Sequence, residues 1–141
     1  MSPRSLLAVL AGALVATVAA VGCGGDDPLF GPPTESTCPP TQTLSYDNFG
    51  KPFMEAYCTR CHSSELVGPA RMGAPSFHDF DSLFGIKAVS EHIDETTAYG
   101  PAAENDSMPP DGAKPTRDER LKLGEWIACG MPETLPAPAA R

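Results

Sequence analysis

The 141-residue chain has few basic residues, with 10 Lys and Arg against 18 Asp and Glu and a formal net charge of −8. An acidic balance of this size argues against nucleic acid and anionic lipid as partners and favours a protein partner that carries a basic patch. The chain also lacks any stretch with sustained alternation of apolar and polar residues, the pattern of half-buried strands. We therefore expect an all-α fold.

Cysteine pairs are scarce as well, since only Cys58 and Cys61 form a Cys-x-x-Cys pair, which His62 follows directly. A thioredoxin-like redox pair needs a βαβ unit, and the proline- and glycine-broken sequence around Cys61 offers none. No second Cys-x-x-Cys or His-x-x-x-His pair is present, whereas zinc sites usually draw on two close pairs. A zinc-binding structural domain with His78 or His92 as fourth ligand stays an alternative.

A Cys-x-x-Cys-His run in an exported protein is typical of covalent haem attachment. The two thiols add across the two vinyl groups of a haem, and the adjacent imidazole becomes an axial ligand of its iron. Two intervening residues bring both sulfurs to one edge of the porphyrin. We therefore predict that Cys58 and Cys61 attach one haem c and that His62 binds its iron.

The first 22 residues have the pattern of a secretory signal, with one positive charge in residues 1–4 and an apolar run over residues 5–21. The stretch from Ala20 to Cys23 resembles a bacterial lipobox, in which Cys23 is lipidated, although Ala20 replaces the usual leucine. Simple secretion stays open, and so does an uncleaved anchor, because about 17 apolar residues are near the lower limit for spanning a bilayer. Each outcome places the folded part outside the cytoplasm, on the periplasmic side of a membrane. No Asp directly follows Cys23, which favours the outer membrane.

The predicted organisation is a signal peptide over 1–22, a Pro/Gly-rich tether over 23–45, one small domain over 46–131 and a loose tail over 132–141. The tether composition cannot bury much surface and predicts an extended segment. Such a segment lets a lipid-anchored, monomeric head reach partners away from the membrane.

Three helices are predicted inside the domain. Asp47 or Asn48 caps the first, whose apolar residues recur at helical spacing up to the Cys58 motif. The second covers about residues 79–93.

The third predicted helix has the clearest start and end. Thr116 and Glu119 fit a capping box, and Gly130 stops the helix.

The sixth ligand of the iron is predicted to be Met108. It precedes Pro109 and Pro110, and a loop stiffened by two prolines loses little conformational entropy when its thioether binds. His78 and His92 remain alternatives. The other methionines considered are Met54, which fits a core position, Met72, which is close to His62 in sequence, and Met131.

Residues 46–130 resemble a mono-haem class I cytochrome c. The matching features are the Cys58–His62 motif after an N-terminal helix, the Met108-Pro109 loop and Trp126 on the C-terminal helix. The resemblance implies a small fold of about three main helices around one haem and an electron carrier rather than an enzyme. A di-haem peroxidase is disfavoured because one Cys-x-x-Cys-His run is present.

The resemblance also implies details of packing and of the site. The first and last helices should cross at small residues, for which Gly50 and Gly124 are the candidates. The carbonyl of Pro75, or of Pro69 as second choice, should accept the hydrogen bond of the His62 imidazole and tune its basicity.

The expected function is single-electron transfer between extracytoplasmic redox proteins, with His62 and Met108 both bound to the iron. Thioether ligation raises the reduction potential. The side chains expected to wall the haem from water are Phe53, Tyr57, Phe77, Phe80 and Trp126. The rival hypothesis is a haem-based sensor or enzyme whose sixth position is open or bound by His78 or His92.

Two cysteines remain after lipidation and haem attachment, Cys38 and Cys129. In an oxidising compartment an even remainder predicts a disulfide. It would close a long loop and contribute stability only.

Overall fold

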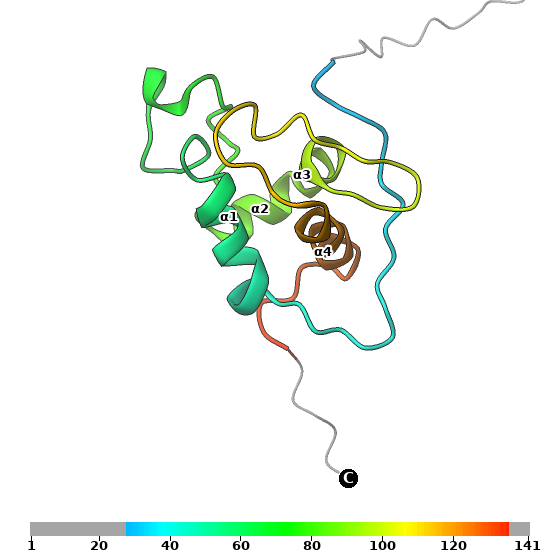
Figure 1. Ribbon diagram of the computed structural model, residues 1–141. Coiled ribbons are helices and arrows are strands. Elements are labelled where there is room, and N and C mark those ends of the chain that lie inside the picture. The colour runs from blue at the N-terminus through cyan, green and yellow to red at the C-terminus, as the bar shows by residue number, and fades with distance from the viewer. Residues whose placement is uncertain (1–27, 136–141) are drawn as a thin grey trace, which may run out of the picture.

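The computed structural model describes residues 28–135, which form short helices joined by long loops (Figure 1). The helices are η1 (Tyr46–Gly50), α1 (Lys51–Tyr57), η2 (Gly68–Arg71), α2 (Leu83–Ala88), α3 (Ser90–Thr97) and α4 (Arg117–Ala128). Residues 28–135 contain no strand, only one isolated bridge between Tyr99 and Glu104. The all-α expectation is therefore confirmed for this part of the chain.

The signal segment over 1–22, the lipidation candidate Cys23 and the end of the tail at 136–141 lie outside the described residues. Within residues 28–135, no helix combines the length and the apolar character needed to cross a membrane.

The first helix begins earlier than predicted. Ser45 Oγ accepts from the Asn48 N–H (3.2 Å), and Asn48 Oδ1 accepts from the Ser45 N–H (2.7 Å). Ser45 is therefore the N-cap, and the prediction of Asp47 or Asn48 is wrong because Asn48 is the reciprocal partner inside the capping box. Pro52 lies in the first turn of α1, where its missing N–H is tolerated.

The predicted second helix is two helices. Ser82 caps α2, since its Oγ accepts from the Gly85 N–H (3.1 Å). Val89 then leaves the helical conformation, with φ −133° and ψ 30°, and buries its side chain in the core. A continuous helix over 79–93 is therefore wrong at its start and at Val89.

The last helix follows its prediction closely. Thr116 and Glu119 form the capping box, and Gly130 adopts a left-handed φ of +75° beyond the helix end. Trp126 on this helix is fully buried with Leu123, Phe53, Met54 and Ile86.

Only one of the two predicted glycine contacts joins the first and last helices. A Cβ on Gly50 would lie 2.4 Å from the Trp126 ring, so Gly50 makes room for a side chain of the last helix, as expected. A Cβ on Gly124 would instead lie 2.4 Å from Ser36 Oγ and 2.8 Å from the Tyr99 carbonyl oxygen. Gly124 therefore makes room for the segment before the domain, and its prediction as a contact to the first helix is wrong.

That segment, residues 29–36, is called the strap below. It is extended as predicted, but it lies along α3 and α4 (Figure 1), and Thr34 is only 1% exposed. A tether free of the domain over 23–45 is therefore wrong for residues 29–36. The Pro- and Gly-rich composition has no apolar periodicity, yet its backbone groups find polar partners on α3.

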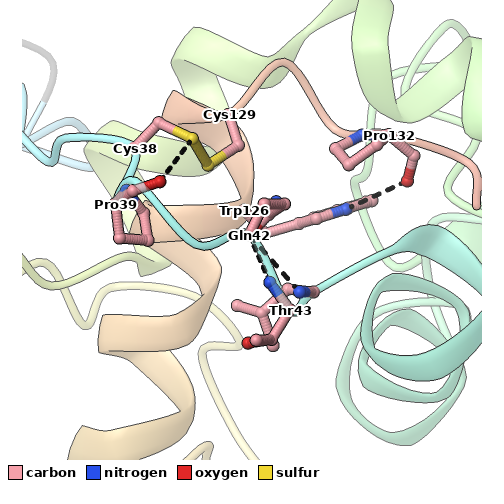
Figure 2. The surroundings of a disulfide bond; sticks show 8 residues. Cys38, Pro39, Gln42, Thr43, Trp126, Cys129 and Pro132 are labelled. Atoms are coloured by element: carbon pink, nitrogen blue, oxygen red, sulfur yellow. Dashed lines mark hydrogen bonds between the residues drawn. A yellow bond between two sulfur atoms is a disulfide. The ribbon is translucent and has the colours of Figure 1, made fainter. Parts of the chain in front are cut away.

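Cys38 and Cys129 form a disulfide, as predicted (Figure 2). It joins the stretch after the strap to the end of α4. Nearby, the Pro132 carbonyl accepts from the Tyr46 N–H (2.7 Å) and from Trp126 Nε1 (3.5 Å). The predicted loose tail over 132–141 is therefore bound to the domain at its first residue.

Candidate functional site

The end of α1 positions the Cys-x-x-Cys-His motif. The Cys58 N–H donates to the Met54 carbonyl (2.8 Å) and so continues the last turn of the helix. The N–H groups of Cys61 (3.1 Å) and His62 (3.0 Å) then both donate to the Cys58 carbonyl, which makes a tight turn. Cys58 and Cys61 are free and half-buried.

A cavity of about 350 Å³ opens beside this turn, a volume in the range of small-molecule and cofactor sites. Its wall is mainly apolar, with Ile93, Pro109 and Pro110 among its residues. The lining side chains that carry sulfur or imidazole are Cys58, Cys61, His62, Met72, His78, His92 and Met108. The motif and the predicted sixth ligand thus line one cavity.

His62 stacks on Phe80, with 4.5 Å between ring centroids. Burial lowers the pKa of His62 from 6.5 to about 4, and the nearby His78 and Arg71 act in the same direction. The ring is therefore neutral at physiological pH, the form that binds a metal. Its Nδ1 is buried and has no hydrogen-bond partner among the described residues. Such a group is rare in a folded protein and fits a ring that a bound group would complete.

Burial, followed by the nearby Cys61, raises the pKa of the Cys58 thiol to about 12. Cys58 is therefore a protonated thiol at neutral pH. Cysteines of redox-active pairs have lowered pKa values instead. Cys58 thus differs from the reactive thiol of a thioredoxin-like site and presents an S–H group to a largely apolar cavity.

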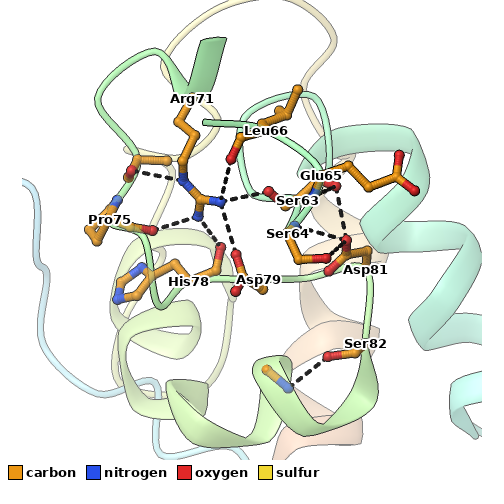
Figure 3. Close-up of polar contacts among 12 residues, drawn as sticks. Ser63, Ser64, Glu65, Leu66, Arg71, Pro75, His78, Asp79, Asp81 and Ser82 are labelled. Carbon is orange, nitrogen blue, oxygen red and sulfur yellow. Dashed lines mark hydrogen bonds and ion pairs between the residues drawn. The ribbon is translucent and has the colours of Figure 1, made fainter. Parts of the chain in front are cut away.

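The chain after the motif folds around the guanidinium of Arg71, which is 5% exposed (Figure 3). It forms an ion pair with Asp79 (2.9 Å) and donates to the carbonyls of Ser63 (2.6 Å) and His78 (3.0 Å). Arg71 therefore holds the loop after His62 closed and brings His78 back beside His62, at 5.8 Å between ring centroids.

This arrangement overturns the predicted role of the Pro75 carbonyl. Pro75 lines the cavity, but its carbonyl accepts from Arg71 Nη2 (2.5 Å) and from the His78 N–H (3.1 Å). The Pro69 carbonyl accepts from the Met72 N–H (3.0 Å). Neither bonds to His62, because Arg71, which was not among the predicted site residues, takes the Pro75 oxygen, and the Pro69 oxygen closes the turn to Met72.

The loop that carries Met108 is fastened to the end of α3. The Met108 N–H donates to the Thr96 carbonyl (2.9 Å), and Ser107 Oγ donates to the same oxygen (3.2 Å). Pro109 is buried, and its carbonyl accepts from Lys114 Nζ. Met108 is therefore held at the cavity wall by its backbone on both sides.

Arg60, inside the Cys-x-x-Cys pair, reaches the same loop. Its guanidinium forms an ion pair with Asp111 and also donates to the Asp111 carbonyl (3.1 Å). The Cys-x-x-Cys-His motif and the Met108 loop are thus joined directly, although the Arg60 and Asp111 side chains are both substantially exposed.

Of the five aromatic residues predicted to wall the haem, the structure brings only some to the cavity. Tyr57 and Phe80 line the cavity. Phe53 and Trp126 do not, since they belong to the core beneath it. Phe77 is 63% exposed and is wrong as a wall residue, because it does not line the cavity; its ring packs edge-on against the next residue, His78, which does, with 4.6 Å between centroids.

The remaining methionines separate into two groups. Met54 and Met131 are buried in the core. Met72 lies at the cavity, but it is 58% exposed and its Sδ lies 3.5 Å from Cys61 Sγ.

Two lining residues come from the strap and were not predicted. Leu29 and Phe30 line the cavity, and the Phe30 ring packs edge-on against His92 at 5.0 Å between centroids. No local sequence signal identifies them, because the contacts span more than sixty residues of chain. In the part of the chain that the structure describes, no group of three or more His, Cys, Asp or Glu residues is arranged to hold a metal ion.

Comparison with models of known protein families, with curated proteins and with solved structures finds no match to this chain. The function is therefore inferred from the chain's own residues.

Proposed function

We propose that this protein is a c-type cytochrome that carries single electrons between extracytoplasmic partners. Cys58 and Cys61 would hold one haem c, with His62 and Met108 as its axial ligands. The observation that carries the proposal is the shared cavity, which gathers both free thiols, a neutral imidazole and a thioether. When bound, the haem supplies an iron that alternates between the ferrous and ferric states.

The chain's own residues have separate tasks in this proposal. Each cysteine S–H adds across one vinyl C=C, so that sulfur bonds to one carbon and the proton goes to the other. Burial keeps His62 neutral and ready to bind. The apolar wall excludes water, which favours the ferrous state, and the fastened Met108 loop limits rearrangement when the electron moves.

A haem stain on a denaturing gel tests covalent attachment. The full chain, expressed with a haem-attachment system in an exporting bacterium, should stain, and the Cys58→Ser/Cys61→Ser variant should not. The Cys38→Ser/Cys129→Ser variant is the matched control and should still stain. An unstained wild type that contains stoichiometric zinc would support the zinc alternative.

The sixth ligand is tested by the ferric absorption spectrum. The far-red sulfur-to-iron band should be present in the wild type, lost in Met108→Leu and kept in Met72→Leu, which alters the other cavity methionine. Loss in Met72→Leu alone would contradict Met108. His78 and His92 remain the competing ligands because both line the cavity.

The proposal places the head on the periplasmic side of a bacterial membrane, anchored through a lipid on Cys23. The membrane fraction should contain the wild type, and Cys23→Ser should remove the lipid. Mass spectrometry of the mature N-terminus distinguishes a lipidated Cys23 from an uncleaved signal segment.

A further inference from the structure

Hydrogen bonds bind the strap to the domain at several points along its length. The Gly31 N–H donates to the Glu95 carbonyl (2.7 Å), and Thr34 Oγ1 donates to the Asp94 carboxylate (2.6 Å). Asn105 Nδ2 donates to the Pro32 carbonyl (2.9 Å), and Ser107 Oγ donates to the Leu29 carbonyl (2.6 Å). The strap therefore joins α3 to the loop that carries Met108.

Phe30, near the start of the strap, lines the cavity. The Phe30 ring meets His92 edge-on, with 5.0 Å between centroids and 62° between planes. Aromatic pairs prefer this geometry, and the contact restricts the rotation of the imidazole. Phe30 is thus the strap residue that can control His92.

His92 is also tied to the other alternative ligand. Its Nδ1 lies 3.4 Å from His78 Nε2, within hydrogen-bonding distance. One ring nitrogen of each imidazole is therefore in contact with the other imidazole, and the Phe30 ring packs against the His92 side of this pair. All three histidines of the chain line the one cavity, so an unrestrained His92 would compete with Met108 for the metal.

We infer that Phe30 is a positioning residue that holds His92 against His78 and so reserves the sixth position for Met108. This inference rests on the proposed haem function. It makes the strap a part of the ligand site rather than a spacer. Removal of the Phe30 ring frees the His92 imidazole, and the fraction of iron bound by histidine increases.

The test uses the full holo-protein and low-temperature EPR, which resolves His/Met from His/His ferric haem even when one form is minor. Phe30→Ala should raise the ratio of His-ligated to Met-ligated protein by about 2- to 13-fold, the range given by the worth of an aromatic pair. It should weaken the far-red band accordingly. Phe30→Tyr keeps the ring and should behave as wild type.

The double variant Phe30→Ala/His92→Gln separates positioning from general loosening of the fold. If His92 is the competitor, its removal restores the Met108 band. An unchanged ratio in Phe30→Ala, or a band that stays lost in the double variant, overturns the inference. Phe84→Ala, at a phenylalanine that is 86% exposed, controls for loss of an aromatic residue elsewhere. A wild type without haem would instead refute the proposed function itself.

Discussion

His62 carries three properties that rarely occur together in one histidine. Its ring is stacked on Phe80, its pKa is strongly lowered by burial, and its Nδ1 lacks a partner among the described residues. Burial disfavours the charged imidazolium and so leaves the nitrogen lone pair available to a metal. These properties support the proposed role of His62 as an iron ligand.

The pH dependence of iron ligation follows from this burial. Because the pKa of His62 in the folded chain is about 4 instead of 6.5, protons compete with iron for the ring only at low pH. We expect the Soret spectrum of the ferric protein to stay constant from about pH 8 down to about pH 5 and to change near pH 4 or below. A spectrophotometric acid titration measures this. A transition centred near pH 6.5 would contradict the buried, neutral state of His62.

Single residues of the site differ in how far the sequence predicts them. The turn from Cys58 to His62 is local, so its spacing alone places two thiols and an imidazole close together. The Pro75 carbonyl was assigned wrongly to His62, because its bonding depends on the competing guanidinium of Arg71. The local sequence does not distinguish a buried arginine that binds several carbonyls from an arginine that is exposed to solvent.

At the scale of elements, the loop with Met108 is held at both ends by Arg120 of α4, which is 5% exposed. Its Nη1 donates to the Asn105 carbonyl (2.5 Å) and the Thr97 carbonyl (3.2 Å), and its Nε donates to the Pro115 carbonyl (3.2 Å). One side chain thus sets the span of the loop and fixes it to the end of α3.

Arg120→Met keeps most of the side-chain volume and removes these three donors. It should lower the free energy of unfolding by at least about 2 kcal/mol, since buried carbonyls lose their partners. It should also weaken the far-red band of Met108. Urea denaturation and the ferric spectrum measure the two effects.

Arg117→Met is the control for that prediction. The Arg117 guanidinium lies over the Tyr99 ring at 4.1 Å on the exposed side of α4. Its loss should cost less than about 1 kcal/mol and leave the band unchanged. Equal effects of the two substitutions would show that Arg120 does not position the loop.

Helix boundaries are predicted correctly where they depend on residues that are close in sequence. The capping box from Thr116 to Glu119 and the stop at Gly130 involve neighbours in sequence, and α4 matches its prediction. The break at Val89 is set by tertiary packing, because this residue leaves the helix to enter the core. The strap was predicted as a free tether since its partners, such as Asp94 for Thr34, lie 60 residues away.

At the scale of the whole molecule, the Cys38–Cys129 disulfide closes a loop with a sequence separation of 91 residues. In the chain-entropy account a loop of this length contributes about 4 to 5 kcal/mol to stability. Cys38→Ser/Cys129→Ser should therefore lower the urea midpoint markedly, while the Soret spectrum stays that of the wild type. A change in the spectrum would show that the disulfide also shapes the cavity.

The net charge of −8 belongs to the molecule as a whole and acts on every redox partner that approaches it. Attraction between opposite charges raises encounter rates by roughly 10-fold or more at low salt, and ions screen it over a Debye length of about 10 Å at 0.1 M. Reduction of the ferric protein by a cationic ruthenium ammine should therefore slow as salt is added. Oxidation of the ferrous protein by anionic ferricyanide should accelerate over the same range.

Stopped-flow kinetics with this pair of reagents gives an internal control, because viscosity or unfolding would change both rates in one direction. If both rates change with salt in the same direction, the acidic residues lie away from the path of the electron and serve solubility. If the two rates change in opposite directions, the result supports a physiological partner with a basic docking patch.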